Sequence, residues 1–113
     1  MAVSPGYTEY VIDQLAGLGR VTSRRMFGGV GLYLEDVFFA LISQETVYFK
    51  VDDSNRADYE SRGMQPFRPY SKRPQLSLSY FAVPVEVLES DEEMVRWARR
   101  SLAVARAAGP RKS

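Results

Sequence analysis

The sequence of 113 residues contains neither cysteine nor histidine. Without cysteine the chain can form no disulfide and no thiolate metal site. Without histidine it lacks the commonest general base and the commonest neutral metal ligand. These absences exclude histidine-dependent hydrolytic triads and zinc sites built on cysteine or histidine, and they leave lysine-based or all-carboxylate mechanisms open. We expect no cofactor and no metal.

Long apolar runs and a strong charge imbalance are also missing. No run approaches the roughly 20 apolar residues that a membrane-spanning helix needs. The N-terminus does not show the charged-then-apolar profile of a signal peptide. The 15 basic and 14 acidic residues give a net charge of +1, which provides no global attraction to nucleic acid or to an anionic membrane. We therefore expect a cytoplasmic protein without membrane contacts.

Apolar and aromatic residues are plentiful. A hydrophobic fraction of 45% and an aromatic fraction of 12% indicate a folded chain. A chain of this length fits one domain, which buries roughly two-thirds of its unfolded surface. We expect residues 1–113 to form a single domain with an ordered core from about residue 5 to residue 108.

The N-terminal segment has the pattern of an amphipathic helix. Ser4-Pro5 is a typical helix start, and Gly19 is a typical terminator. Between them we predict a helix from about Gly6 to Leu18. Its apolar stripe consists of Tyr7, Val11, Leu15 and Leu18. We expect this stripe to cover a sheet rather than to bind a partner.

Four strand-like runs follow the helix. They are Val21–Phe27, Val30–Leu34, Val37–Ser43 and Thr46–Val51. Gly28-Gly29 permits a turn or a bulge between the first two runs. Glu35-Asp36 and Gln44-Glu45 form gaps short enough for tight hairpins, although neither gap contains glycine. We predict a meander of antiparallel strands.

The short gaps also predict a register. Residues that flank a two-residue loop pair with each other, so Leu34 is expected beside Val37 and Ser43 beside Thr46. One predicted face carries Val30, Leu32, Leu34, Val37, Phe39, Leu41, Tyr48 and Lys50. The other carries Tyr33, Phe38, Ala40, Ile42, Val47, Phe49 and Val51. Both faces are largely apolar, which favours helices on one face and some self-association. A one-residue slip would mix the two sets.

The second half of the chain adds helices and little further strand. A short helix is predicted from about Ser54 to Arg62, capped by Asp52-Asp53, and a strand from Gln75 to Val83. Ser90–Glu93 reads as a capping box for a final helix to about Ala107. Its basic side carries Arg96, Arg99, Arg100 and Arg106, which we expect to be solvated rather than to bind DNA. Segregated strands of this kind are typical of an α+β fold.

Basic residues at two places are candidates for binding. Arg24 and Arg25 precede the double glycine, and three further cations alternate with aromatic residues in a proline-rich stretch. The five candidate residues for nucleic-acid or anion binding are Arg24, Arg25, Arg68, Lys72 and Arg73. An alternative is a small-ligand or anion site made by Arg24, Arg25 and the Gly28-Gly29 backbone amides. The simpler interpretation is that the glycines only bend a strand.

Ser71-Lys72 is a formal nucleophile–base pair. Neighbouring residues in a loop seldom point together as that chemistry requires. We therefore expect no enzymatic activity.

Several motifs together resemble one known family. Arg24–Tyr33, Tyr48–Asp52, Gly63–Phe67, Ser79–Pro84 and Trp97-Ala98 are similar, in this order, to the N-terminal domain of the TfoX/Sxy family of bacterial competence regulators. The resemblance implies an α-β-β-β-α-β-β-α fold, in which an antiparallel sheet is packed by helices as in secretion chaperones, often as a homodimer. It also implies a non-enzymatic role in transcriptional regulation of DNA uptake, through a protein or DNA partner. Longer members carry a second, helical domain, and the family supplies no catalytic residues.

Overall fold

The computed structural model describes residues 5–26, 28–67 and 79–108. The elements are α1 (Pro5–Gln14), the 3-10 helix η1 (Ala16–Leu18), β1 (Val21–Met26), β2 (Gly29–Leu34), β3 (Val37–Ser43), β4 (Thr46–Lys50), α2 (Arg56–Glu60), β5 (Tyr80–Ala82), α4 (Val85–Leu88) and α5 (Asp91–Ala107). Helices and an antiparallel sheet occupy separate layers, which confirms the predicted α+β class.

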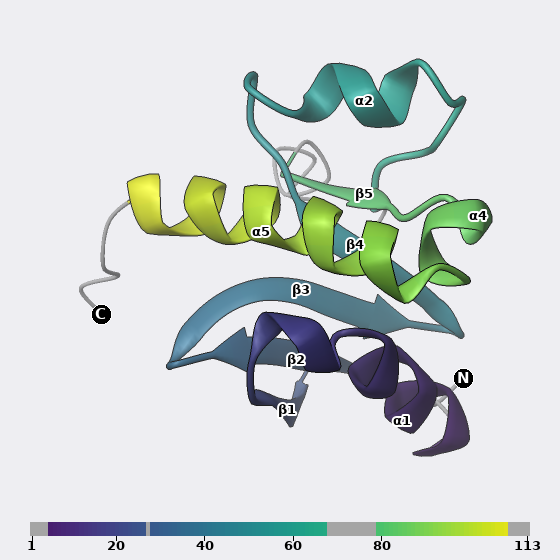
Figure 1. The fold of residues 1–113 in the computed structure, drawn as a ribbon, viewed down its shortest axis with the longest axis vertical. Coiled ribbons are helices and arrows are strands. Elements are labelled where there is room, and N and C mark those ends of the chain that lie inside the picture. Colours follow the sequence, from purple (N-terminus) through teal and green to yellow (C-terminus); the bar gives the residue numbers. More distant parts are fainter. Residues whose placement is uncertain (1–4, 27, 68–78, 109–113) are drawn as a thin grey trace.

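The strands form one sheet in the order β1-β2-β3-β4-β5, and each strand is antiparallel to its neighbour. Figure 1 shows α5 running across the sheet with α1 beside it. The four strands predicted before the second helix are confirmed as β1 to β4. The family resemblance implied three strands before that helix and two after it, whereas among the described residues a single strand follows α2, before the short helix α4.

The two tight hairpins have the predicted pairings. Leu34 pairs with Val37, and Ser43 pairs with Thr46. Both loops adopt left-handed backbone angles, with φ of 52° and 69° at Glu35-Asp36 and of 53° and 62° at Gln44-Glu45. Two positive φ values match the right-handed twist of the flanking strands. The loop length thus determined the hairpins although glycine is absent from both.

The predicted assignment of side chains to the two faces holds through Phe39 and was wrong beyond it. A β-bulge shifts the register between Leu32 and Tyr33, so that Leu32 pairs with Ala40 while Tyr33 pairs with Phe38. Phe39 is the extra residue opposite this step. A bulge of one residue inverts the side-chain alternation beyond it. The inverted residues are Ala40, Leu41, Ile42, Val47, Tyr48, Phe49, Lys50 and Val51.

As a result the two faces of the sheet differ more than expected. The core face carries Leu32, Leu34, Ala40, Ile42, Val47, Phe49 and Phe81, all of which are buried. The outer face carries Thr22, Arg24, Met26, Gly31, Tyr33, Phe38, Leu41, Ser43, Thr46, Tyr48, Lys50, Tyr80 and Ala82. Most outer-face side chains in β2, β3 and β4 are only half-buried. The predicted arrangement of helices on one face is confirmed, since the helical core residues cluster with the core face.

The N-terminal helix is shorter than predicted and ends in a 3-10 turn. Val11 and Leu15 are fully buried, and Tyr7 and Leu18 pack against the same core. The expectation that this stripe covers the sheet is therefore confirmed. Gly19 ends the segment with a φ of 143°, an angle that residues with a Cβ rarely adopt.

The capping predictions in the second half were partly correct. The Ser90 hydroxyl accepts a hydrogen bond from the Glu93 amide at 3.2 Å, as predicted. The Glu93 carboxylate, however, binds Arg96 rather than closing the reciprocal half of the box. The second helix begins later than expected, at Arg56, because Asp52 accepts hydrogen bonds from the Ser54 amide and hydroxyl and so stabilises a turn. These bonds lower the pKa of Asp52.

Candidate nucleic-acid interface

Arg24 and Arg25 lie on β1, at the edge of the sheet, and both are exposed. Arg24 pairs with Gly31 and Arg25 pairs with Val30. Successive side chains of a strand point to opposite faces, so the two guanidinium groups lie on opposite sides of the sheet. Arg24 is on the outer face, and Arg25 is not. The two arginines therefore cannot hold one anion between them as a clamp.

An aromatic ring supports Arg24. The guanidinium carbon lies 5.0 Å from the centroid of the Tyr33 ring, within the range of a cation–π contact. Tyr33 in turn stacks on Phe38, with ring centroids 5.2 Å apart and an interplanar angle of 29°. Arg24 is thus held over an aromatic surface that begins next to the sheet edge.

The aromatic surface continues across the outer face. Phe38 lies 5.8 Å from Tyr80 on β5, and the Lys50 ammonium lies 5.1 Å from the Tyr80 ring centroid. Farther along β4, Tyr48 packs against Phe67 at 5.0 Å in an edge-on arrangement. Aromatic rings therefore extend from β2 to β5, with one cation on β1 and one on β4 beside them.

All charged side chains of the five strands are basic. The residues of β1 to β5 include Arg24, Arg25 and Lys50 and no aspartate or glutamate. Burial raises the pKa of Tyr80 and that of Tyr48, although a hydrogen bond with Thr46 opposes the effect at Tyr48. Both phenols therefore remain neutral near pH 7, and they add no negative charge to the outer face.

The double glycine has a structural role. Gly28 adopts a φ of +76° in the connection between β1 and β2. A Cβ on Gly29 would lie 2.4 Å from the Ile42 carbonyl oxygen, so only glycine allows this approach of the backbones. The simpler interpretation, in which Gly28-Gly29 shapes the strands, accounts for both positions.

The remaining predicted site residues lie outside the described residues. These are Arg68, Lys72 and Arg73, together with the Ser71-Lys72 pair. Their assignment to nucleic-acid or anion binding stays a prediction. In the part of the chain that the structure describes, no group of acidic residues is arranged to hold a metal ion. No described helix is long and apolar enough to cross a membrane.

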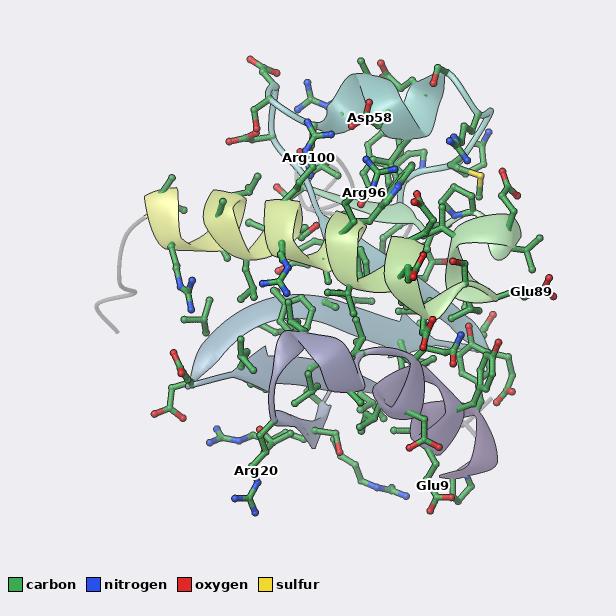
Figure 2. The ribbon with its side chains drawn as sticks, in the orientation of Figure 1. Glu9, Arg20, Asp58, Glu89, Arg96 and Arg100 are labelled. Carbon is green, nitrogen blue, oxygen red and sulfur yellow. The ribbon has the colours of Figure 1, made fainter. Side chains whose placement is uncertain are left out.

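The basic side of α5 is largely neutralised. Its ion pairs are Arg96 with Glu93, Arg100 with Asp58 and Arg106 with Glu35. Figure 2 shows Arg100 of α5 and Asp58 of α2 directed toward each other. A helix face whose cations already have carboxylate partners attracts phosphate less, so the outer face of the sheet is the stronger candidate.

Sequence reasoning missed the outer-face aromatic residues as functional candidates. Tyr33, Phe38 and Tyr80 belong to separate strands, and the bulge at Phe39 decided which residues share their face. A usable signal was present nevertheless. The strands lack acidic residues and contain aromatic residues and cations, the composition of a surface for an anionic partner.

Comparison with known protein families identifies the family to which this chain belongs. The model of the TfoX N-terminal domain family matches residues 13–105, so this chain belongs to that family. A segment of 66 residues is 36% identical to the DNA transformation protein TfoX1 of Aliivibrio fischeri (strain ATCC 700601 / ES114). The match covers 58% of this chain and 32% of that relative, so the aligned part is about a third of the relative's length.

Proposed function

We propose that this chain is a non-enzymatic regulatory domain of bacterial competence, which acts in the transcriptional regulation of DNA uptake through a protein or DNA partner. The observation that carries the proposal is the family match over residues 13–105. The similarity to a DNA transformation protein supports the link to DNA uptake. Because the alignment covers 32% of that relative, the activity of the whole relative is transferred only as part of this proposal.

A direct test is genetic. Deletion of the gene in its natural host is expected to lower the transformation frequency and the transcript levels of DNA-uptake genes. Complementation with the intact chain should restore both. Unchanged transformation and unchanged transcripts in the deletion strain would contradict the regulatory function.

In the DNA branch of the proposal, Arg24 and Arg25 contact phosphates from the two sides of β1, together with Arg68, Lys72 and Arg73. The exposure of both β1 arginines at a sheet edge supports this assignment. Each phosphate contact on duplex DNA adds about 0.9 to the slope of log K against log salt. We expect Arg25→Gln to lower that slope by about 1.

Fluorescence anisotropy with labelled duplex DNA over a range of salt concentrations measures this slope. Arg99→Gln removes the same charge from the exposed side of α5 and serves as the matched control. An absence of duplex binding at low ionic strength would refute the DNA branch and would leave a protein as the partner.

A homodimer is part of the proposal. Among the described residues β1 has β2 as its neighbour in the sheet, whereas β5 is bordered by residues 65–67, with Phe67 N–H donating to the Tyr80 carbonyl at 2.8 Å. An open strand edge offers backbone donors and acceptors to a second copy. Pairing there would extend the sheet and leave its outer face accessible. Light scattering after size exclusion tests this, and a monomeric mass at all concentrations would contradict it.

A further inference from the structure

The outer face combines two features that suit one kind of ligand. Half-buried rings of Tyr33, Phe38 and Tyr48 lie along it, and cations lie over two of its rings. We propose that the outer face binds single-stranded nucleic acid. Arg24 then moves from the Tyr33 ring to a phosphate, one base takes its place on that ring, another base stacks on Tyr48, and Lys50 holds a further phosphate. The inference rests on the proposed function in one respect, because both place nucleic acid against Arg24.

A soluble sheet face that is not covered by helices usually carries polar side chains. Here the described helices pack on the core face, while the outer face carries four aromatic side chains, those of Tyr33, Phe38, Tyr48 and Tyr80. Aromatic rings on a sheet offer flat surfaces on which unpaired bases stack, regardless of sequence.

The charge of the strands is complementary to that of phosphate groups. The strands contain basic residues and no acidic residue, so phosphates meet no repulsion from strand side chains. The Arg24 guanidinium carbon lies 5.0 Å from the Tyr33 ring centroid, and the Lys50 ammonium lies 5.1 Å from the Tyr80 ring centroid. Each cation is therefore next to an aromatic ring. A second copy of the same face would bring like charges together, which disfavours it as the occupant.

Surface rings favour single strands over duplexes. In a duplex the faces of the bases are stacked inside the helix, and they cannot contact rings on a flat surface. In a single strand the bases are free to stack on such rings. Five neighbouring strands span about 19 Å, since adjacent strands lie about 4.8 Å apart, and this width accommodates several nucleotides.

Fluorescence anisotropy with labelled oligothymidylate of about 12 nucleotides, with oligouridylate of the same length and with a matched duplex tests the inference. We expect the intact chain to bind the single strands more tightly than the duplex. Tyr33→Leu and Tyr48→Leu, which keep apolar volume but remove the ring, should weaken single-strand binding about fivefold or more. Tyr33→Phe keeps the ring and should bind like the wild type.

The charge variants give a separate readout. Arg24→Gln should lower the slope of log K against log salt by about 0.7, the contribution of one phosphate of a single strand. Arg99→Gln, on the exposed side of α5, should leave the slope unchanged. The tyrosine variants should lower affinity without changing the slope, because stacking releases no counterion.

Photo-crosslinking of the wild-type chain to the same oligonucleotide keeps the test independent of whether the variants fold. Adducts are expected on the outer-face strands, and adducts confined to α5 would overturn the inference. Equal affinity for duplex and single strand, unaffected by the tyrosine variants, would also overturn it while leaving the proposed DNA contact in place. Single-strand binding without duplex binding would support the inference and refute duplex recognition. Binding to neither would refute both.

Discussion

The two faces of the sheet are built from the same strands but carry different chemistry. On the core face, Ile42, Val47 and Phe49 are almost completely buried beneath helices. On the outer face, the neighbouring residues Leu41 and Tyr48 are only half-buried. Each strand therefore contributes alternately to an enclosed core and to an aromatic surface that carries cations.

The two faces should therefore contribute differently to the stability of the fold. A closely packed interior gains free energy from every buried methylene group. A surface rich in rings and cations, in contrast, can bind a ligand without being essential to the core. Substitutions at matched positions on the two faces should therefore have very different effects on stability.

The largest contrast is expected between Phe49 and Tyr48, adjacent residues on opposite faces. Phe49 is fully buried and lies 6.0 Å from the Phe39 ring. Phe49→Ala should lower the free energy of unfolding by about 3–5 kcal/mol, because it leaves a cavity. Tyr48→Ala should cost about 1–2 kcal/mol. Urea denaturation measures both, and equal losses would show that the outer face is also a structural core.

The two glycines of β2 provide a second contrast. A Cβ on Gly29 would lie 2.4 Å from a backbone oxygen, whereas one on Gly31 would meet the flexible end of Met26 at 2.9 Å. Gly29→Ala should therefore cost about 1–3 kcal/mol, and Gly31→Ala clearly less, since the methionine can move. A larger loss for Gly31→Ala in thermal unfolding would mean that Met26 and the adjacent Phe38 ring are rigidly packed.

Alkaline pH should destabilise the folded chain through two buried tyrosines. Burial raises the pKa of Tyr59 in the core and of Tyr80 on the outer face above the ordinary value of 10.0. Below pH 10 both phenols are protonated in the folded and the unfolded chain, and their contribution to stability is fully present. Above pH 10 the unfolded state loses protons first, so stability falls by up to about 1.4 kcal/mol per pH unit for each tyrosine.

Tyr59→Phe and Tyr80→Phe should each make this alkaline decline less steep. Urea denaturation at a series of pH values gives the slope. If Tyr80→Phe leaves the slope unchanged while Tyr59→Phe reduces it, Tyr80 is hydrated in solution, and the outer face is more open than its burial indicates.

The smallest contrast is between Arg24 and Arg25. Arg24→Gln removes the cation–π contact with Tyr33 and should cost about 0.5–1 kcal/mol. Arg25→Gln, on the opposite side of the same strand, should change the free energy of unfolding by less than about 0.5 kcal/mol. Thermal unfolding in low salt compares them. An equal effect of both variants would argue against a specific role of the Tyr33 ring.

The sequence predicted much of the fold because its signals are local. The two-residue gaps defined the hairpins, and the pairings of Leu34 with Val37 and of Ser43 with Thr46 followed from loop length. The Ser90 cap of α5 followed from the capping-box pattern. Such features depend on residues a few positions apart, and a sequence presents those directly.

The candidate site was less predictable. Arg24 and Arg25 were found as a basic pair, but their separation onto opposite faces requires the strand and its register. The grouping of Tyr33, Phe38 and Tyr80 requires contacts between strands that are far apart in the sequence. A local pattern does not contain these distances.

By itself the sequence determined the α+β class, the hairpins, the helix boundaries to within a few residues and the family. The tertiary structure alone decided where the alternation of side chains breaks. A single extra residue at Phe39 moves Ala40, Ile42 and Phe49 to the core and leaves Tyr48 on the outer face. The physical reason is that a bulge is stabilised by packing on both sides of the sheet, which no single strand specifies.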